Sequence, residues 1–276
     1  MISDPTELAE FRQVAREVRR QVLELSVSSK SGHIGSSLSC VELLVALYFH
    51  FLRVLPGQPL ANDRDRFLMS KGHACVPFYA CLERLGFIPS DVLRRYGEEG
   101  GTLGHHPLKC TEYGIEISTG SLGHGLSVGC GMAFTAKLAH YPWRTVVLMS
   151  DGEQNEGAVW EAAMFAAHHR LDNLLAIVDF NKMQALGDNA EIINIEKLDD
   201  RYRAFGWGVR RIDGHDFSAI FDALDGFPFQ AGKPSIIVAD TIKGKGISFM
   251  ENSLLWHYRC PEQAEYRAAL VELDRA

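Results

Sequence analysis

The pattern of apolar and polar positions predicts helices that alternate with buried strands. Apolar residues recur at helical spacing over about residues 5–28. The runs "TVVLM", "NLLAIV" and "SIIVA" are typical of central strands that are covered on both faces. We therefore predict an α/β fold, a doubly wound and mainly parallel sheet with helices on both faces. The expected strands cover residues 145–149, 174–179, 208–212 and 235–240, and the expected helices between them cover 156–170, about 197–204, and 216–225.

The first half of the chain carries the same elements in a less regular order. "LSCVELLVALYFHFL" reads as a helix, and "DRFLMSKGHA" as a short strand that ends in a Gly-His turn. A helix is expected at about 74–85, and a Gly- and Pro-rich passage then extends to about residue 125. "SVGCGMAFTAKLAH" is a helix of small residues suited to close packing. No repeat or linker interrupts the chain, so residues 1–276 are expected to form one domain.

Composition narrows the class of protein. The chain has 276 residues, 46% hydrophobic and 23% charged, which is ordinary for a globular protein. The net charge of -7 disfavours nucleic acid or an anionic membrane as a general partner. No apolar run reaches the roughly 20 residues needed to cross a bilayer. The six cysteines lack zinc or disulfide spacing, so we expect reduced thiols in a cytoplasmic protein.

Oxygen-bearing side chains follow two of the predicted strands. Asp151 comes directly after one strand, and Asn181 follows the next. Ligands bind beyond the carboxyl ends of the strands in such sheets, and Mg²⁺ prefers oxygen ligands together with substrate phosphates. A metal-held diphosphate is therefore one interpretation. The other is that Asp151 only caps the helix that follows.

The wider pattern resembles a known family. "SDGEQNEGAVWEAAMFAAHHRLDNLLAIVDFN" is similar to the thiamine diphosphate fingerprint, in the form that transketolases carry. "SKSGHIGSSLSCVELLVALY", "DRFLMSKGHA", "GHHP", "STGSLGHGLSVGCGMA" and "KGKGISFMENSLLWH" resemble further transketolase segments in the same order. The resemblance covers nearly the whole chain and implies a single domain that binds thiamine diphosphate and metal, followed by a C-terminal extension.

The resemblance also implies roles for individual residues. Mg²⁺ or Ca²⁺ would be bound by Asp151, Asn181 and the carbonyl of Met183, and Gly152 would let the backbone approach the diphosphate. Glu156 would pair with a catalytic Glu of the neighbouring subunit. The cofactor rings would lie against Gly120 and Leu122, and the channel above them would be lined by His33, His73, His106 and His257.

Several of these positions have plainer interpretations. Leu122 could be ordinary core, and His257 could be a surface residue near the C-terminus. Glu153 is expected to be a solvated acid in the first turn of a helix. The sequence also departs from the family at four places: Ser150 replaces a Gly, His124 a Gln and Tyr258 a Gly, and the pair His105 and His106 leaves the channel residue ambiguous, with His106 preferred. These departures suggest a specialised substrate.

One group that the chemistry needs is missing from the matched positions. A carboxylate must face the aminopyrimidine of the cofactor, and in transketolases it lies in a second, pyrimidine-binding domain that is followed by a third. The resemblance therefore implies the N-terminal subunit of a split transketolase, whose partner chain supplies the Glu. The assembly could be αβ or an α2β2 heterotetramer, and we prefer the α2β2 heterotetramer. The expected reaction moves a two-carbon ketol unit from a ketose, or ketose phosphate, to an aldose. The alternatives are acyl or ketol transfer in specialised metabolism, to a modified sugar or a non-sugar acceptor, and a non-catalytic regulatory subunit.

Overall fold

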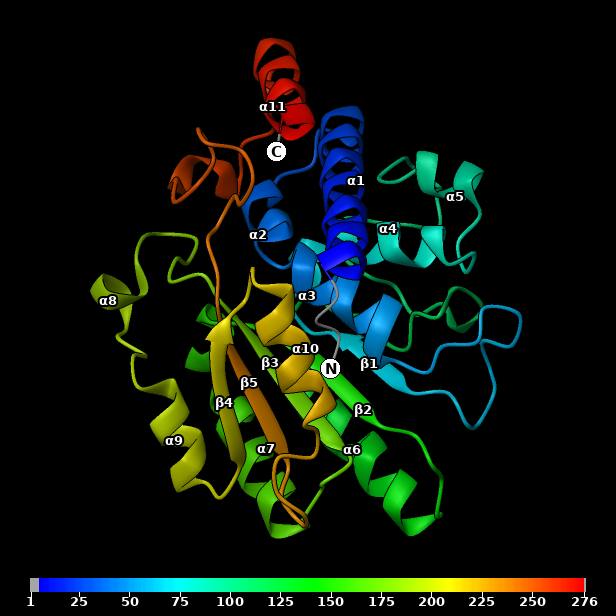
Figure 1. Cartoon of the computed structure of the whole chain (residues 1–276), viewed down its shortest axis with the longest axis vertical. Coiled ribbons are helices and arrows are strands. Elements are labelled where there is room, and N and C mark those ends of the chain that lie inside the picture. Colours follow the sequence, from blue (N-terminus) through cyan, green and yellow to red (C-terminus); the bar gives the residue numbers. More distant parts are fainter. Residues whose placement is uncertain (1–4, 276) are drawn as a thin grey trace.

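A five-stranded sheet forms the centre of the protein. The computed structural model describes residues 5–275. All neighbouring strands in the sheet are parallel, in the order β1-β2-β3-β5-β4. Figure 1 shows the strands side by side with their twist. The strands are β1 (Arg66–Met69), β2 (Thr145–Ser150), β3 (Leu174–Phe180), β4 (Gly208–Asp213) and β5 (Ser235–Asp240).

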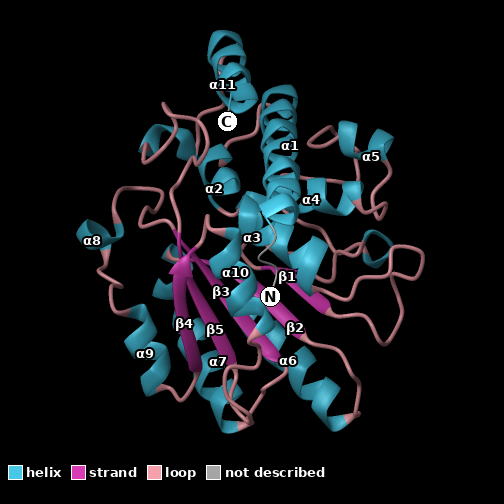
Figure 2. Cartoon of the chain, viewed as in Figure 1, coloured by secondary structure: helices cyan, strands magenta, loops and turns pink. Residues whose placement is uncertain are grey.

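Helices cover both faces of the sheet (Figure 2). Alternate residues of β2 point to opposite sides, as strand geometry requires. Val146 and Leu148 pack in one apolar cluster with α1, α3, α4 and α10, whereas Val147 and Met149 pack in a second cluster with α6, α7 and α9. The doubly wound α/β fold is thus confirmed. The helices are α1 (Pro5–Ser29), α2 (Ile34–Ser39), α3 (Val41–Ala46), α4 (Cys75–Arg84), α5 (Ser90–Arg94), α6 (His124–Leu138), α7 (Gly157–His168), α8 (Asn189–Ile192), α9 (Leu198–Ala204), α10 (Phe217–Asp225) and α11 (Gln263–Arg275).

The structure differs from the sequence prediction mainly in the first half. The expected helix of residues 38–52 is interrupted: α2 ends at Ser39, α3 follows Cys40, and residues Leu47–Phe51 form a π-helical turn. The side chains of Ser39 and Cys40 both bond the carbonyl of Ser36, at 3.0 and 3.6 Å. Such local bonds compete with the helical backbone ladder. The helices α5, α8 and α11 were not predicted.

The carboxyl ends of the strands meet at one edge of the sheet. The register pairs Ser150 with Asp179 and Phe180 with Asp240, so β2, β3 and β5 end at the same level. The segments that leave these ends carry the predicted cofactor residues, which places them at this edge. Within residues 5–275, none of the helices combines the length and apolar character that a membrane span requires.

Candidate active site

A cavity of about 370 Å³ opens at the carboxyl edge of the sheet. Its wall comes from segments that are far apart in sequence, and every residue of the predicted set belongs to it. The structure therefore brings together residues that lie in separate motifs of the sequence. The lining comprises His33, Ser36, His73, His106, Gly120, Leu122, Ser150, Asp151, Gly152, Asn155, Glu156, Asn181, Met183, Gln184, Ala185, His257 and Tyr258.

Four histidines form a cluster around His33. The centroid of the His33 ring lies 5.3 Å from that of His73, 6.3 Å from that of His106 and 5.1 Å from that of His257. Burial, with the nearby charge of His106, lowers the pKa of His33 to about 4. Burial and the charge of Lys243 lower the pKa of His257 to about 3, and burial lowers the pKa of His73 and of His106. The cluster is therefore neutral at physiological pH.

The preference for His106 over His105 agrees with the structure. His106 lines the cavity, whereas the ring of His105 packs beside Tyr96, with centroids 5.4 Å apart. His257 is not a frayed surface residue, because only 9% of it is exposed. Leu122 is half-buried and contributes to the cavity wall rather than to the core clusters.

Asp151, Asn181 and Met183 supply oxygen atoms to one part of the cavity wall. The Asp151 carboxylate is 1% exposed and accepts the backbone N–H of Gly152 at 2.7 Å and of Lys182 at 2.6 Å. Asp151 thus caps the short 3-10 turn of residues 152–155 and also binds the loop after β3. The Asn181 side-chain oxygen accepts the N–H of Met183 at 3.1 Å. Burial, with the charge of Asp179, raises the pKa of Asp151 to about 6.

Two buried lysines bond residues of the cavity wall without lining the cavity, and neither was predicted individually. The ammonium group of Lys243 donates to the carbonyl of Met183 at 3.3 Å and to Nδ1 of His257 at 2.8 Å. Since an ammonium can only donate, neutral His257 carries its proton on Nε2. Burial lowers the pKa of Lys243 to about 8. The lysine stands in the "KGKG" segment, where its buried position could not be read from sequence.

The second lysine, Lys71, lies next to Ser36 of the cavity wall. It is fully buried, forms an ion pair with Asp179 and donates to the carbonyl of Ser36 at 3.0 Å. Asp179 also accepts the hydroxyl of Ser39 at 2.5 Å and that of Thr241. The charges are therefore paired and hydrogen-bonded, as burial of an ion pair demands. The "SKGHA" turn indicates a site through its histidine, whereas its lysine carries no sequence signal of burial.

The prediction for Glu153 is wrong. The sequence predicts a solvated acid, but the residue is 0% exposed. Its carboxylate accepts the hydroxyl of Ser70, the N–H of Gly123 at 2.8 Å and the N–H of Ser150 at 3.2 Å. Burial raises its pKa. The short turn after β2 folds this side chain back toward β1, so it connects three loops rather than facing water.

The remaining acid and the departures from the family pattern occupy distinct places. Glu156 is exposed at the edge of the cavity, and Ser150 fits within its wall. His124 is the first residue of α6 and lies outside this cavity. Tyr258 is part of the wall, with its ring centroid 4.6 Å from that of His257. Of the three substitutions, Ser150 and Tyr258 therefore contact the cavity.

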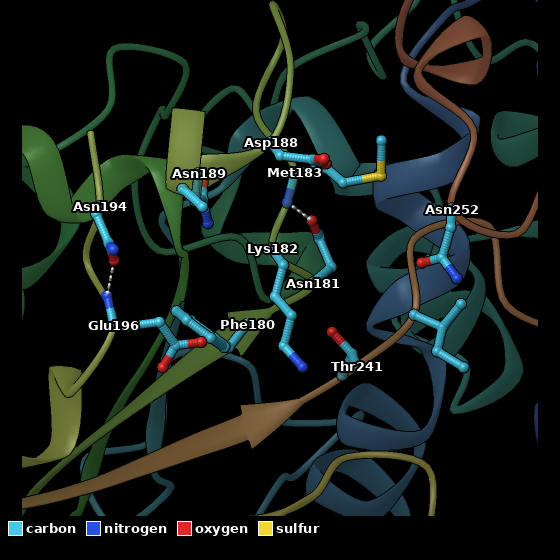
Figure 3. A pocket seen from close by; sticks show the side chains of 12 residues that line it. Phe180, Asn181, Lys182, Met183, Asp188, Asn189, Asn194, Glu196, Thr241 and Asn252 are labelled. Atoms are coloured by element: carbon cyan, nitrogen blue, oxygen red, sulfur yellow. Dashed lines mark hydrogen bonds between the residues drawn. The ribbon is translucent and has the colours of Figure 1, made fainter. Parts of the chain in front are cut away.

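A second cavity of about 550 Å³ lies behind the loop that follows β3. Figure 3 shows it, with the hydrogen bond between Asn181 and Met183 near the centre, Asn252 on the right and Asn194 and Glu196 on the left. The two cavities share Asn181 and Met183. The loop after β3 therefore contributes to the walls of both cavities.

Comparisons with known proteins agree with this geometry. Residues 11–268 match the family model described as transketolase, thiamine diphosphate binding domain. The chain is 43% identical over 256 residues to one of the subunits of apulose-4-phosphate transketolase from Phocaeicola vulgatus, a match that covers 93% of this chain and 91% of that protein. It is 41% identical over 266 residues to 6-deoxy-6-sulfo-D-fructose transketolase subunit SqwG of a Clostridium species, covering 96% and 97%.

Solved structures give the same result. The transketolase of Campylobacter jejuni superposes with a TM-score of 0.88 at 29% identity, over 98% of this chain and 43% of that one. The chain thus spans less than half the length of that transketolase but nearly all of the two subunits. It matches proteins named as transketolase subunits over nearly its whole length, and it belongs to the transketolase family of thiamine-diphosphate-dependent transferases.

Proposed function

We propose that this chain forms the cofactor- and metal-binding half of an enzyme that transfers a two-carbon ketol unit from a ketose to an aldose. The observation that carries the proposal is the cavity at the carboxyl edge of the sheet. It unites the neutral histidines with the oxygen groups of Asp151, Asn181 and Met183. No comparable set would be needed by a chain that only binds or regulates.

The oxygen groups of the cavity wall fit a divalent metal and a diphosphate. A carboxylate, an amide oxygen and a backbone carbonyl are hard ligands of the type that Mg²⁺ and Ca²⁺ prefer. A Cβ added to Gly152 would lie 3.1 Å from the side chain of Gln184, so the glycine keeps space open for a ligand. Lys243 adds a buried positive charge beside Met183. Asp151, Asn181 and Met183 would hold the metal, and the metal with Lys243 would neutralise the diphosphate.

The chain's own residues would then handle the sugar. Thiamine diphosphate, when bound, supplies the electron sink for carbon–carbon bond cleavage and formation. The histidine cluster would bind substrate hydroxyls, because a neutral imidazole has one donor and one acceptor. The same groups would move protons between the sugar oxygens and solvent. Gly120 and Leu122 would form the wall against which the cofactor rings pack.

A partner subunit would complete the site. The match to proteins named as subunits implies such a chain. We propose that it supplies the catalytic Glu, that this Glu pairs with Glu156, and that two copies of each chain form an α2β2 assembly. Support comes from the exposure of Glu156 and from exposed apolar side chains on α6 and α7, where Val128 is 39% and Met164 53% exposed. Exposed apolar side chains of this kind mark contact surfaces.

The substrate class follows from the same relatives. Their names specify one phosphorylated ketose and one sulfonated ketose, so we propose a ketose that carries an anionic group. Four residues of this cavity are neutral histidines, which suits the hydroxylated part of such a sugar. A cytoplasmic location is part of the proposal, and the six free cysteines support it because reducing compartments keep thiols unpaired.

The test measures Mg²⁺-dependent binding of thiamine diphosphate by calorimetry, with the chain by itself and in complex with its partner. Asp151→Asn should weaken binding by about 100-fold, by analogy with the loss of metal-site partners. Asp188→Asn is the matched control, because Asp188 is exposed and lies on the loop after β3 but outside the cofactor cavity. Equal binding by both variants would contradict the metal role. Full ketol transfer by the chain without a partner would contradict the two-chain enzyme.

A further inference from the structure

An aromatic side chain stands at the mouth of the cofactor cavity without a structural reason of its own. The ring of Tyr258 meets that of His33 at 71° with centroids 5.4 Å apart, and that of His257 at 66° and 4.6 Å. Yet the residue is 65% exposed. Within residues 5–275, its hydroxyl has no hydrogen-bond partner. A large exposed aromatic in a polar cavity therefore needs an explanation other than core packing.

The backbone of Tyr258 is fixed in position. A Cβ added to Gly32 would lie 2.7 Å from the carbonyl oxygen of Tyr258, so the two segments are in direct backbone contact. The N–H of His33 donates to the carbonyl of His257 at 2.7 Å, and the N–H of Arg259 donates to that of Leu255 at 3.3 Å. The ring thus projects from a rigid turn. Tyrosine has few rotatable bonds, so its contact surface costs little entropy on binding.

We propose that Tyr258 determines which substrates this site accepts, because its ring narrows the space above His33 and His257 and limits the length of the sugar chain that fits there. The inference rests on the proposed function, since it assigns the sugar to the histidine cluster. The ring contacts both His33 and His257, and 65% of the residue stays exposed. Substrates with a longer carbon chain would meet the exposed part of the ring, whereas short ones would end before it.

The experiment compares two ketose donors in the complete assembly of this chain and its partner. L-Erythrulose is the short donor, D-fructose 6-phosphate is the long donor, and D-ribose 5-phosphate is the acceptor for both. For each variant we take the ratio of kcat/KM for the long donor to that for the short donor. Tyr258→Gly should raise this ratio about tenfold or more, since pocket sterics discriminate by such factors. Tyr258→Phe should leave it within about twofold, because the ring is kept.

Leu255→Ala is the matched control. Leu255 lies in the same turn and is 53% exposed, but it does not line the cavity, so its ratio should equal that of the wild type. Binding of thiamine diphosphate should be the same in all variants. An unchanged ratio in Tyr258→Gly, or an equal loss with both donors, would overturn the inference. Failure of the wild-type assembly to use either donor would overturn the proposed function and, with it, the substrate role of Tyr258.

Discussion

Glu42 lies at the centre of a buried ion cluster that joins three parts of the fold. Arg19 of α1 donates to both carboxylate oxygens of Glu42 on α3, at 2.6 and 2.7 Å. His215 lies on the other side, with Nδ1 3.1 Å from Glu42. The Nε2 of His215 accepts the N–H of Ile242 at 2.8 Å, so its proton is on Nδ1 and is donated to Glu42. The cluster therefore anchors the segment that carries Lys243, which bonds Met183 and His257 of the cavity wall.

The magnitude of the Glu42 contribution follows from its pKa. Burial alone would raise the pKa, but Arg19 and His215 together lower it to about 2, from 4.5. A shift of about 2.5 units corresponds to about 3 kcal/mol of folding stability. Removing one partner of a buried ion pair costs about 3–5 kcal/mol, in agreement with that figure. We expect Glu42→Gln to lose about 3 kcal/mol at neutral pH, because Arg19 is left buried without its counter-charge.

The sign of the pH dependence is also defined. The folded-state pKa of Glu42 is below its unfolded value, so the stabilisation is complete above about pH 4.5 and is lost as the pH falls toward 2. Urea unfolding at pH 7 and at steps down to pH 3 measures both effects. Glu17→Gln is the control, since the Glu17–Arg84 pair is about 40% exposed and should contribute under about 1 kcal/mol. A loss below 1 kcal/mol in Glu42→Gln, with the wild-type pH slope retained, would refute the reasoning.

Variants at two further buried residues, Lys71 and Glu153, test the contacts that these side chains make near the site. Lys71→Met leaves the fully buried Asp179 unpaired and should cost about 3–5 kcal/mol in urea unfolding, while the double variant with Asp179→Asn should recover part of that loss. If Lys71→Met and the double variant had equal free energies of unfolding, the result would contradict the ion pair between Lys71 and Asp179. Glu153→Ala removes the acceptor of three donors and should cost about 2 kcal/mol or more, beyond Glu153→Gln, which keeps one oxygen. If Glu153→Ala left the free energy of unfolding unchanged, the result would favour the first interpretation, in which Glu153 is a solvated acid.

Much of the fold follows from periodicity alone. The predicted strand of residues 174–179 is β3 within one residue, and the predicted helix of 216–225 is α10, because buried strands and amphipathic helices carry strong patterns. The failures lie where tertiary contacts decide. Helix α11 buries only Ala269 and Leu273, which is a weak pattern, and the break at Cys40 depends on side-chain bonds that periodicity does not record.

The candidate site also has a part that the sequence predicted and a part that it did not. The motifs predicted which groups converge, since strand ends of a parallel sheet meet at one edge. They did not predict burial. Glu153 and Lys71 sit beside the glycines and histidines of the motifs, yet both are at 0% exposure and structural in their contacts. Sequence gives the chemical type of such residues, whereas the direction in which a short turn points a side chain depends on partners from other loops.

The carboxylates that line the cavity indicate where a partner chain would complete the proposed site. Its histidines are neutral, and its positive charge comes from buried Lys243. Among the described residues, its lining contains two carboxylates, and Asp151 is already bonded to two backbone N–H groups. Glu156 is the other, and it is exposed at the edge. Under the proposed two-chain enzyme, the partner's carboxylate would approach from the side of Glu156, where α7 begins.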